Sequence, residues 1–476
     1  METIKKISLV FYLLCLCQLV RAQQLITYPA PVNMPPGAMN DDFTVKVRKP
    51  GGQWQDLAIY AVQVDMHKPV NSSVAYFDFS GQVEVAITAN KTNIKSARIR
   101  PISYSFTPEV TGNSLKFSLS EPRNLSIEIN DDIFHNLQLF AGPVEQKKPK
   151  PKGKNVMYFG PGFHSPGPEV KVPSGTTVYL AGGAVVETKL VCDKVENVRI
   201  TGRGMLYQAE RGIEVTHSKH VEIDGIIVAN PKHYTVYGGQ SQFLTIRNLK
   251  AFSSKGWSDG LDMMSCSDVL IDGVFMRNSD DCIAIYGHRW NYYGDARNIR
   301  VQNSSLWADV AHPVNIGTHG NPEKPEIIED IVFFNLDILN HDEPQIAYQG
   351  CFALNASDEN LIRNIRFENI RIEDFQQGQL VNLRVTFNKK YAKAPGRGIE
   401  NILFKNVSYN GNQANISVLS SYNEARAIKG VTFENLKING KLIRNADQAR
   451  FSVGEHIDGL VFKVDESTPE TKANKQ

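Results

Sequence analysis

The 476-residue sequence has little cysteine, no strong excess of charge of one sign and, past its N-terminus, no long apolar run. The 52 Lys and Arg residues nearly balance the 50 Asp and Glu residues, and no long basic stripe is present, which argues against a nucleic-acid partner. No stretch after the N-terminus is long and apolar enough to predict a membrane span. The hydrophobic fraction of 42% is that of a globular protein with a large core.

The six cysteines include two in the N-terminal segment. The other four have no metal-ligand spacing and lie in or next to apolar strand segments: Cys192, Cys266, Cys282 and Cys351. We interpret them as small buried hydrophobic residues. Disulfides remain open as the alternative, although the spacing does not indicate any. The sequence indicates no metal site and no cofactor.

The first 22 residues predict a secretory signal peptide. Lys5 and Lys6 form a basic start, and Ile7–Val20 is mostly apolar but too short to span a bilayer comfortably. Ala22 offers a small residue for cleavage. We therefore expect a secreted or periplasmic protein. A lipoprotein is less favoured, because leucine precedes both N-terminal cysteines where a small residue is required.

A six-residue pattern recurs nine times in the C-terminal two thirds. Each copy alternates polar and apolar residues and ends in Asn or Gly, and the copies begin at Asn197, His220, Phe243, Asp268, Asn298, Asp330, Asn364, Asn401 and Gly430. The alternation predicts a half-buried strand, and the closing Asn or Gly tolerates a left-handed turn. The repeat spacing, about 23 residues at first and longer later, is typical of a solenoid. We predict a right-handed parallel β-helix over residues 155–464. A leucine-rich horseshoe is disfavoured, because no helical segment recurs.

The region before the repeats has a different pattern. Alternating runs such as Val83–Ile87 and Leu115–Phe117 are separated by turn signals, which predicts an antiparallel β-sandwich for residues 23–145. The proline-rich, charged segment QKKPKPKGK predicts a linker over residues 146–154, with a basic substrate-contact strip as the alternative. Residues 465–476 are polar and predict a disordered tail. The predicted fold class is therefore all-β.

Polar side chains precede three short predicted strands in the segments SDGLDMM, SDDCIAIYG and AHPVNIGTHG. Asp259 precedes the first strand, Asp280 and Asp281 precede the second, and His312 precedes the third. Strands stacked in register lie about 4.8 Å apart, so the three carboxylates and the imidazole are expected at one edge of one sheet. Each residue alone could be a turn former. Their joint placement favours a catalytic site.

Crowded carboxylates suit acid–base chemistry. Like charges raise the pKa of at least one group, which then serves as a proton donor, while an ionised neighbour serves as a base. Cleavage of a glycosidic bond with inversion requires such a pair, with room for a water molecule. A protonated His312 could tune the acid or bind a hydroxyl group.

Neighbouring positions at the same edge predict substrate contacts. Aromatic residues interleaved with polar ones suit sugar rings, which have apolar faces and hydroxyl rims. The candidates are Lys232, His233, His288, Arg289, Trp290, Tyr292, Tyr293, Tyr348 and Gln349. An ordinary loop with one packed aromatic residue is the alternative for the segment after Tyr286.

The three polar segments resemble the NTD, DDCIAI and GHGxSIGS series of glycoside hydrolase family 28, the polygalacturonase family. The predicted sandwich, the linker and the YFGPG start of the helix are more similar to family 49, the dextranases and isopullulanase. The resemblance covers nearly the whole chain after the signal peptide and implies a β-helix with an inverting three-aspartate site. The resemblance implies that Asp280 is the general acid and that Asp259 and Asp281 hold and activate the attacking water. It also matches His312 to the family 28 histidine.

Departures from the family pattern concern the substrate. Trp257 and Ser258 stand where family 28 has Asn-Thr, and Ala311 and Pro313 replace glycines. The Arg-Ile-Lys triplet that binds the substrate carboxylate in polygalacturonases is missing, and the corresponding strand is CFALNA. We therefore expect an exported, inverting hydrolase of an α-linked polysaccharide other than polygalacturonate, for example a neutral one. The alternatives are a pectin-degrading polygalacturonase, a polysaccharide lyase and a non-catalytic carbohydrate-binding β-helix.

Overall fold

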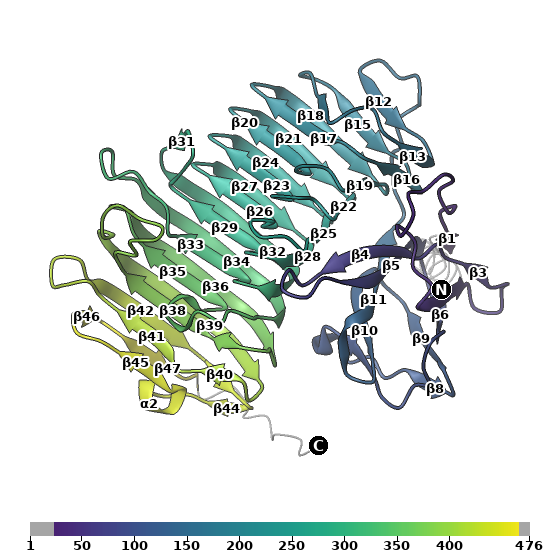
Figure 1. Cartoon of the computed structure of the whole chain (residues 1–476). Helices are drawn as coiled ribbons and strands as arrows, with labels where there is room; N and C mark the ends of the chain where they lie inside the picture. Colours follow the sequence, from purple (N-terminus) through teal and green to yellow (C-terminus); the bar gives the residue numbers. More distant parts are fainter. Residues whose placement is uncertain (1–22, 466–476) are drawn as a thin grey trace, which may run out of the picture.

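The computed structural model describes residues 23–465, which are almost entirely β-structure (Figure 1). An N-terminal β-sandwich is followed by a long parallel β-helix, and the sandwich packs against one side of the helix. The predicted signal peptide and all but the first residue of the predicted tail lie outside the described residues. Within residues 23–465, no helix is long and apolar enough to cross a membrane.

Two sheets form the sandwich, with strand orders β1-β5-β11-β10-β7, where β4 also pairs with β5, and β3-β2-β6-β9-β8. Their bounds are β1 Gln24–Ile26, β2 Phe43–Arg48, β3 Gln55–Asp56, β4 Tyr60–Val64, β5 Val70–Ser80, β6 Val83–Ala89, β7 Ala97–Arg100, β8 Glu109–Thr111, β9 Ser114–Leu119, β10 Arg123–Ile129 and β11 Asp132–Pro143. Alternate residues of β6 are buried, as predicted for a sheet with one face on the core. The pairings are antiparallel except between β5 and β11, which run parallel. Between β5 and β11 the chain passes through strands of the second sheet. The alternation of residues within each strand does not reveal this connection.

An 11-stranded parallel sheet forms one face of the β-helix. Its strands, in spatial and chain order, are β14 Glu169–Lys171, β17 Lys189–Asp193, β20 Ile213–Thr216, β23 Val236–Gly239, β26 Leu261–Met264, β29 Ile283–Tyr286, β33 Val314–Gly317, β35 Phe352–Ala356, β38 Val381–Val385, β41 Ser417–Ser420 and β45 Phe451–Val453. Each strand comes from a successive coil, so the residues that precede neighbouring strands meet at one edge.

The remaining faces belong to a 21-stranded sheet. Its early coils carry two short strands each: β12 Val156–Phe159, β13 Gly162–His164, β15 Thr177–Leu180, β16 Ala184–Val186, β18 Glu196–Gly202, β19 Met205–Tyr207, β21 Lys219–Asp224, β22 Ile227–Ala229, β24 Gln242–Arg247, β25 Lys250–Phe252, β27 Ser267–Asp272 and β28 Phe275–Ser279. Later coils begin with single long strands: β32 Ala296–Val310, β34 Ile327–Asn340, β36 Leu361–Glu373 and β39 Gly398–Asn410. The last coils hold β42 Ile428–Glu434, β43 Lys437–Ile438, β44 Lys441–Leu442, β46 Ile457–Asp458 and β47 Val461–Lys463.

Short elements decorate the coils. The hairpin β30 His288–Arg289 and β31 Tyr292–Tyr293 follows β29, and β37 Gly378–Gln379 pairs with β40 Ala414–Asn415. The described helical segments are η1 Ile102–Tyr104, η2 Ile346–Tyr348 and α2 Ala446–Ala449. The fold is thus the predicted all-β class, and the horseshoe alternative, which needs a recurring helix, is excluded.

The nine recurring segments form strands whose turns are left-handed, as predicted. Every closing Asn or Gly has a positive φ, and so does every first residue of a segment. The asparagine amides stack from coil to coil: Asn335 donates to Asn303 at 2.8 Å, and Asn406 donates to Asn369 at 2.9 Å. Asparagine suits these positions because its short polar side chain tolerates the left-handed region and bonds locally.

The helix interior is a continuous apolar core. Phenylalanines stack along it, with ring centroids 4.9 Å apart between Phe333 and Phe367 and between Phe367 and Phe404. The four cysteines singled out in the sequence are buried and free. Their interpretation as small buried hydrophobic residues is therefore confirmed.

The sandwich docks on the helix through a separate apolar cluster that includes Tyr76 and Phe140 on one side and Phe275 on the other. The β4–β5 hairpin extends from the sandwich along the helix (Figure 1). At its turn, the main-chain N–H of Met66 donates to Ser279 Oγ at 3.1 Å. Because Ser279 is the last residue of β28, the sandwich is anchored next to the predicted catalytic edge.

Candidate active site

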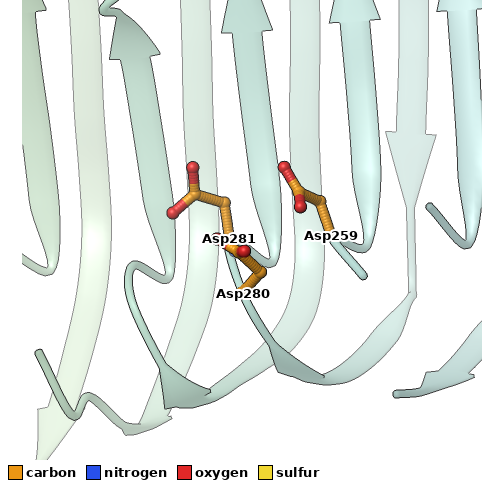
Figure 2. Close-up of side chains that lie close together, drawn as sticks. All are labelled: Asp259, Asp280 and Asp281. Carbon is orange, nitrogen blue, oxygen red and sulfur yellow. The ribbon is translucent and has the colours of Figure 1, made fainter. Parts of the chain in front are cut away.

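The predicted catalytic residues lie together at the starting edge of the 11-stranded sheet. Strands β26, β29 and β33 are neighbours in register, so the loops that enter them are adjacent. Figure 2 shows Asp259, Asp280 and Asp281 side by side at two neighbouring strand starts. One carboxylate oxygen from each of the three lies within 4.8 Å of the other two. His312 enters β33 and contacts Asp281.

Asp281 is a carboxylate with three hydrogen-bond donors. Its Oδ1 lies 2.6 Å from His312 Nδ1 and accepts from the main-chain N–H of His312 at 3.2 Å. Its Oδ2 accepts from the side-chain amide of Asn315 at 2.7 Å. These donors fix the orientation of the carboxylate and suit its negative charge.

His312 is fully buried, and both of its ring nitrogens face acceptors. Nδ1 faces Asp281, and Nε2 faces the main-chain carbonyl of Tyr348. Burial lowers the pKa of His312, but the charge and hydrogen bond of Asp281 outweigh it and raise the pKa to about 9. A protonated imidazole donates to both acceptors, so His312 and Asp281 form an ion pair at neutral pH.

Asp280 is the carboxyl group suited to proton donation near neutral pH. Burial, followed by the charge of Asp281, raises the pKa of Asp280 to about 7. Two main-chain N–H groups hold the side chain: Trp257 donates to Oδ2 at 2.9 Å, and Asp281 donates to Oδ1 at 3.1 Å. An acid whose pKa is close to the working pH is an efficient donor.

Asp259 and Asp262 are buried with oxygens that have no partner among the described residues. These are Oδ1 of Asp259 and both carboxylate oxygens of Asp262. Burial and the neighbouring carboxylates raise the pKa of each group well above its usual range. A buried polar atom without a partner is costly, and such atoms concentrate where a ligand completes the hydrogen bonding.

An aromatic wall, made of His233, Tyr234, Trp257 and Trp290, lies on the β23 side of the acids. The rings of Tyr234 and Trp290 stack at 5.3 Å, and His233 lies 6.0 Å from Trp290 and 6.5 Å from Trp257. Burial lowers the pKa of His233 to about 4, so its ring is neutral at neutral pH. The wall offers apolar faces next to the carboxylates.

The other predicted substrate contacts are placed differently. Arg289 has a buried Nε without a partner among the described residues, and Tyr234 and Asp259 are among the groups that raise its pKa. His288 lies in the same hairpin, with an unpartnered Nδ1. Lys232 is exposed, and its Nζ lies 3.9 Å from a carboxylate oxygen of Glu210.

Tyr348 and Gln349 differ in whether their side chains reach the carboxyl groups. The Tyr348 hydroxyl accepts from the amide of Asn315 at 3.2 Å, and its ring meets that of His312 edge-on at 4.5 Å. Gln349 is buried, and its side chain bonds to the Glu343 carbonyl at 2.7 Å and to Asn415 at 3.0 Å. The structure thus brings Tyr348 to the acids and gives the polar atoms of Gln349 protein partners.

Sequence reasoning missed four residues of this site: Asp262, Asn315, Trp257 and Tyr234. Asp262 and Asn315 lie inside strands β26 and β33. Both are in register with Ala284 on β29, the strand between them, so their side chains face outward on the same side of the sheet. The signal for Asp262 was a lone acid among apolar residues in LDMM, three positions after Asp259. Trp257 was noted only as a departure from a family pattern, although its N–H holds Asp280.

Three carboxylate oxygens this close together also have the donor set of a divalent cation site. The absence of a metal, expected from the sequence, stays a prediction.

The chain belongs to the glycosyl hydrolases family 28, whose family model matches residues 174–451, more than half of the sequence. An exopolygalacturonase (clone GBGE184) of Arabidopsis thaliana is 22% identical over 49% of this chain and 56% of its own length. Endopolygalacturonase B of Aspergillus niger is 26% identical over 35% of this chain and 42% of its own length. The chain thus spans less than two thirds of these curated relatives.

Among solved structures, Dex49A from Penicillium minioluteum superposes with a TM-score of 0.67 at 14% identity, covering 92% of this chain and 96% of that one. A family 28 exopolygalacturonase from Yersinia enterocolitica gives a TM-score of 0.53 at 12% identity, over 86% and 98% of the two chains. These likenesses confirm the β-helix fold. The protein is therefore a glycosidase by family, and its substrate and residue roles are matters for proposal.

Proposed function

We propose that this protein hydrolyses an α-linked polysaccharide by a single displacement, with Asp280 as general acid and Asp259 and Asp281 activating water. The observation that carries the proposal is the contrast between adjacent carboxyl groups. Asp280 has a pKa of about 7, whereas Asp281 is paired with a protonated imidazole and an amide. Two carboxyl groups in such different environments divide into acid and base.

In the proposed reaction Asp280 gives its proton to the glycosidic oxygen as the bond between that oxygen and the anomeric carbon breaks. A water molecule, oriented by Asp259, attacks the anomeric carbon and gives its proton to Asp281. His312 and Asn315 act as positioning residues, since they hold Asp281 and do not themselves exchange protons with the substrate.

The three oxygens can share one water molecule. The oxygens lie within 4.8 Å of one another, and at that upper limit a point equidistant from all three is about 2.8 Å from each, an ordinary O–H···O distance. The unpartnered Oδ1 of Asp259 would gain a hydrogen bond there. This supports a role for Asp259 and Asp281 in holding the nucleophile.

The stereochemical outcome is a demanding test. A spacing within 4.8 Å is shorter than the roughly 6.5–9.5 Å of typical inverting sites and nearer to the 5–5.5 Å of retaining ones. Inversion is proposed from the resemblance to families 28 and 49 and not from this spacing. Proton NMR of the first product, recorded before mutarotation, should show the inverted anomer. A retained anomer would instead make one of these aspartates a covalent nucleophile.

A neutral glycan is the proposed substrate class. On β35, the groove-facing positions beside Asn315 and Gly317 are Ala353 and Asn355, which carry no charge to meet a uronic acid. The second candidate is polygalacturonate, favoured by the named activities of the relatives in family 28. Arg384, in register with Asn355 on the next strand, is a cation that such a substrate could use.

A screen on dextran, pullulan and polygalacturonate tests both candidates. Release of reducing ends from a neutral α-glucan supports the first, and cleavage of polygalacturonate alone supports the second. A product that absorbs in the near ultraviolet would indicate an unsaturated sugar and a lyase. Binding without cleavage by the wild type would indicate a carbohydrate-binding β-helix. An exported location is proposed from the N-terminal sequence.

A further inference from the structure

We propose that Trp257 is the stacking platform for the sugar unit bound next to Asp280, a specificity-determining contact within the aromatic wall. The inference rests on the proposed function and deepens it, because it assigns a ligand to one residue of the site. That ligand is a hexopyranose of an α-linked glycan, whose C–H face lies on the indole.

Trp257 is displayed to solvent by a loop that is itself rigidly held. Trp257 is 68% exposed and stands at the tip of an exposed turn between buried residues. The next residue, Ser258, is fully buried, and its hydroxyl donates to the Lys255 carbonyl at 2.6 Å and accepts from the Lys255 N–H at 3.1 Å. Ser253 Oγ donates to the Ser258 carbonyl at 2.5 Å. The exposure of the indole is therefore fixed by the loop and does not come from a loose segment.

The backbone of Trp257 is strained for this display. Its φ is +59°, in the left-handed region that large side chains avoid. Glycine would adopt this conformation without strain, and the neighbouring Gly256 shows that the loop has open space around it.

The strained residue is coupled to the proposed acid. Its N–H donates to Asp280 Oδ2 at 2.9 Å, so the main chain places the carboxyl group while the side chain faces solvent. Asp280 protonates the glycosidic oxygen, so the sugar attached to that oxygen must lie within the length of one sugar ring from the Asp280 carboxyl group. The indole therefore lies where an adjacent sugar unit has to pass.

The surroundings of the indole favour a ring with an apolar face. Across the wall, Trp290 is 40% exposed and also has a positive φ, of 53°. His233, between the two tryptophans, is neutral at neutral pH. Two exposed tryptophans with a neutral ring between them form a surface suited to C–H contacts with pyranoses.

Replacing Trp257 by glycine separates binding from stability. Trp257→Gly keeps the N–H that Asp280 needs and relieves the positive φ, so its thermal midpoint should equal or exceed that of the wild type. KM for the cleaved oligosaccharide should rise about tenfold, while kcat changes little, because one stacked ring is lost. Trp257→Phe keeps a ring and should recover part of the loss in KM.

Tryptophan fluorescence gives a readout that does not need turnover. The chain has four tryptophans, so each can be replaced singly. In an Asp259→Asn background, short isomalto-oligosaccharides or oligogalacturonides should quench emission, and Trp257→Phe should remove most of this quenching. Trp54→Phe, in the sandwich, is the matched control and should leave quenching and KM unchanged.

The outcomes separate the two proposals. Unchanged KM and unchanged quenching in Trp257→Gly overturn the platform while leaving the hydrolase intact. Binding of a probe without cleavage by the wild type overturns the hydrolase, and quenching through Trp257 still supports the platform. If neither probe binds the wild type, the platform for α-linked hexopyranoses is overturned.

Discussion

Two clusters of buried charged side chains differ in whether their charges are paired. The interdomain charge cluster, where the sandwich docks, consists of Arg100, Glu128, Arg277, Asp309 and Glu373. The carboxylate cluster at the sheet edge consists of Asp259, Asp262, Asp280 and Asp281. In the interdomain cluster each carboxylate contacts an arginine, for example Asp309 with Arg277 at 3.0 Å. The carboxylate cluster has four acids and one cationic partner in contact, His312.

This difference separates a structural from a chemical use of burial. Arg277 and Asp309 are fully buried, and the guanidinium is also bound by Asn136 and the Ile133 carbonyl, so its donors are used. The carboxylate cluster instead keeps oxygens without partners among the described residues, and burial together with the neighbouring carboxylates raises the pKa of Asp259 and Asp262. Paired charge holds two domains together, whereas carboxyl groups without a counter-charge are available to a substrate.

The largest effect is expected from breaking a pair in the interdomain charge cluster. Arg277→Met leaves Asp309 buried without its counter-charge, and the free energy of unfolding should fall by about 3–5 kcal/mol. Denaturant unfolding measures the loss. The double variant Arg277→Met with Asp309→Leu should recover much of it, because no unpaired charge remains. Equal stability of the two variants would contradict the account of pairing.

The next effect is catalytic. Asp280→Asn removes the proposed proton donor, and kcat should fall at least about a hundredfold, the usual scale for losing a general acid. The exposed Asp56→Asn in the sandwich is the matched control and should keep full activity. Near-normal turnover by Asp280→Asn on the true substrate would show that another group donates the proton.

A smaller effect of opposite sign is expected for the stability of the carboxylate cluster. Asp262→Asn removes a buried carboxyl group whose raised pKa makes the folded state hold a proton that the unfolded chain releases at neutral pH, so the free energy of unfolding should rise by about 1–3 kcal/mol. Activity should fall in the same variant if the oxygens serve the substrate. A loss of stability would mean that Asp262 has partners that the geometry does not reveal.

The two regions also differ in how far the sequence predicts them. The recurring alternation specified the coils of the helix, because each repeat shows the same half-buried pattern with a left-handed residue at its end. Asp259, Asp280, Asp281 and His312 could be placed together because all precede strands of one register. Their catalytic roles stay a prediction.

What the sequence did not reveal depends on the direction of single side chains. Asp262 and Asn315 lie inside strands, where an outward polar residue resembles any surface position until the neighbouring coils are stacked. Gln349 was expected in the groove, but its amide bonds to Asn415, 66 residues further along the chain. The parallel pairing of β5 with β11 was missed for the same reason, since it depends on a connection through the other sheet.

The last predicted effect is a dependence of stability on pH that belongs to Asp280. The folded protein raises its pKa from 3.8 to about 7, so the folded state holds the proton more tightly than the unfolded state does. Where the unfolded chain binds fewer protons, stability falls as pH rises. The contribution of Asp280 is therefore unchanged below pH 4, declines between about pH 4 and 7, and is level above that.

Asp280→Asn lacks this titration, so the difference in stability between the variant and the wild type should grow in favour of the variant across that window. Denaturant midpoints at a series of pH values measure the difference, and subtracting the two proteins removes the contributions of groups that do not interact with Asp280. The same titration predicts that kcat/KM falls above about pH 7, as the acid loses its proton. A constant difference from pH 4 to pH 7 would mean that Asp280 has an ordinary carboxyl pKa, and the assignment of the general acid would then lose its electrostatic basis.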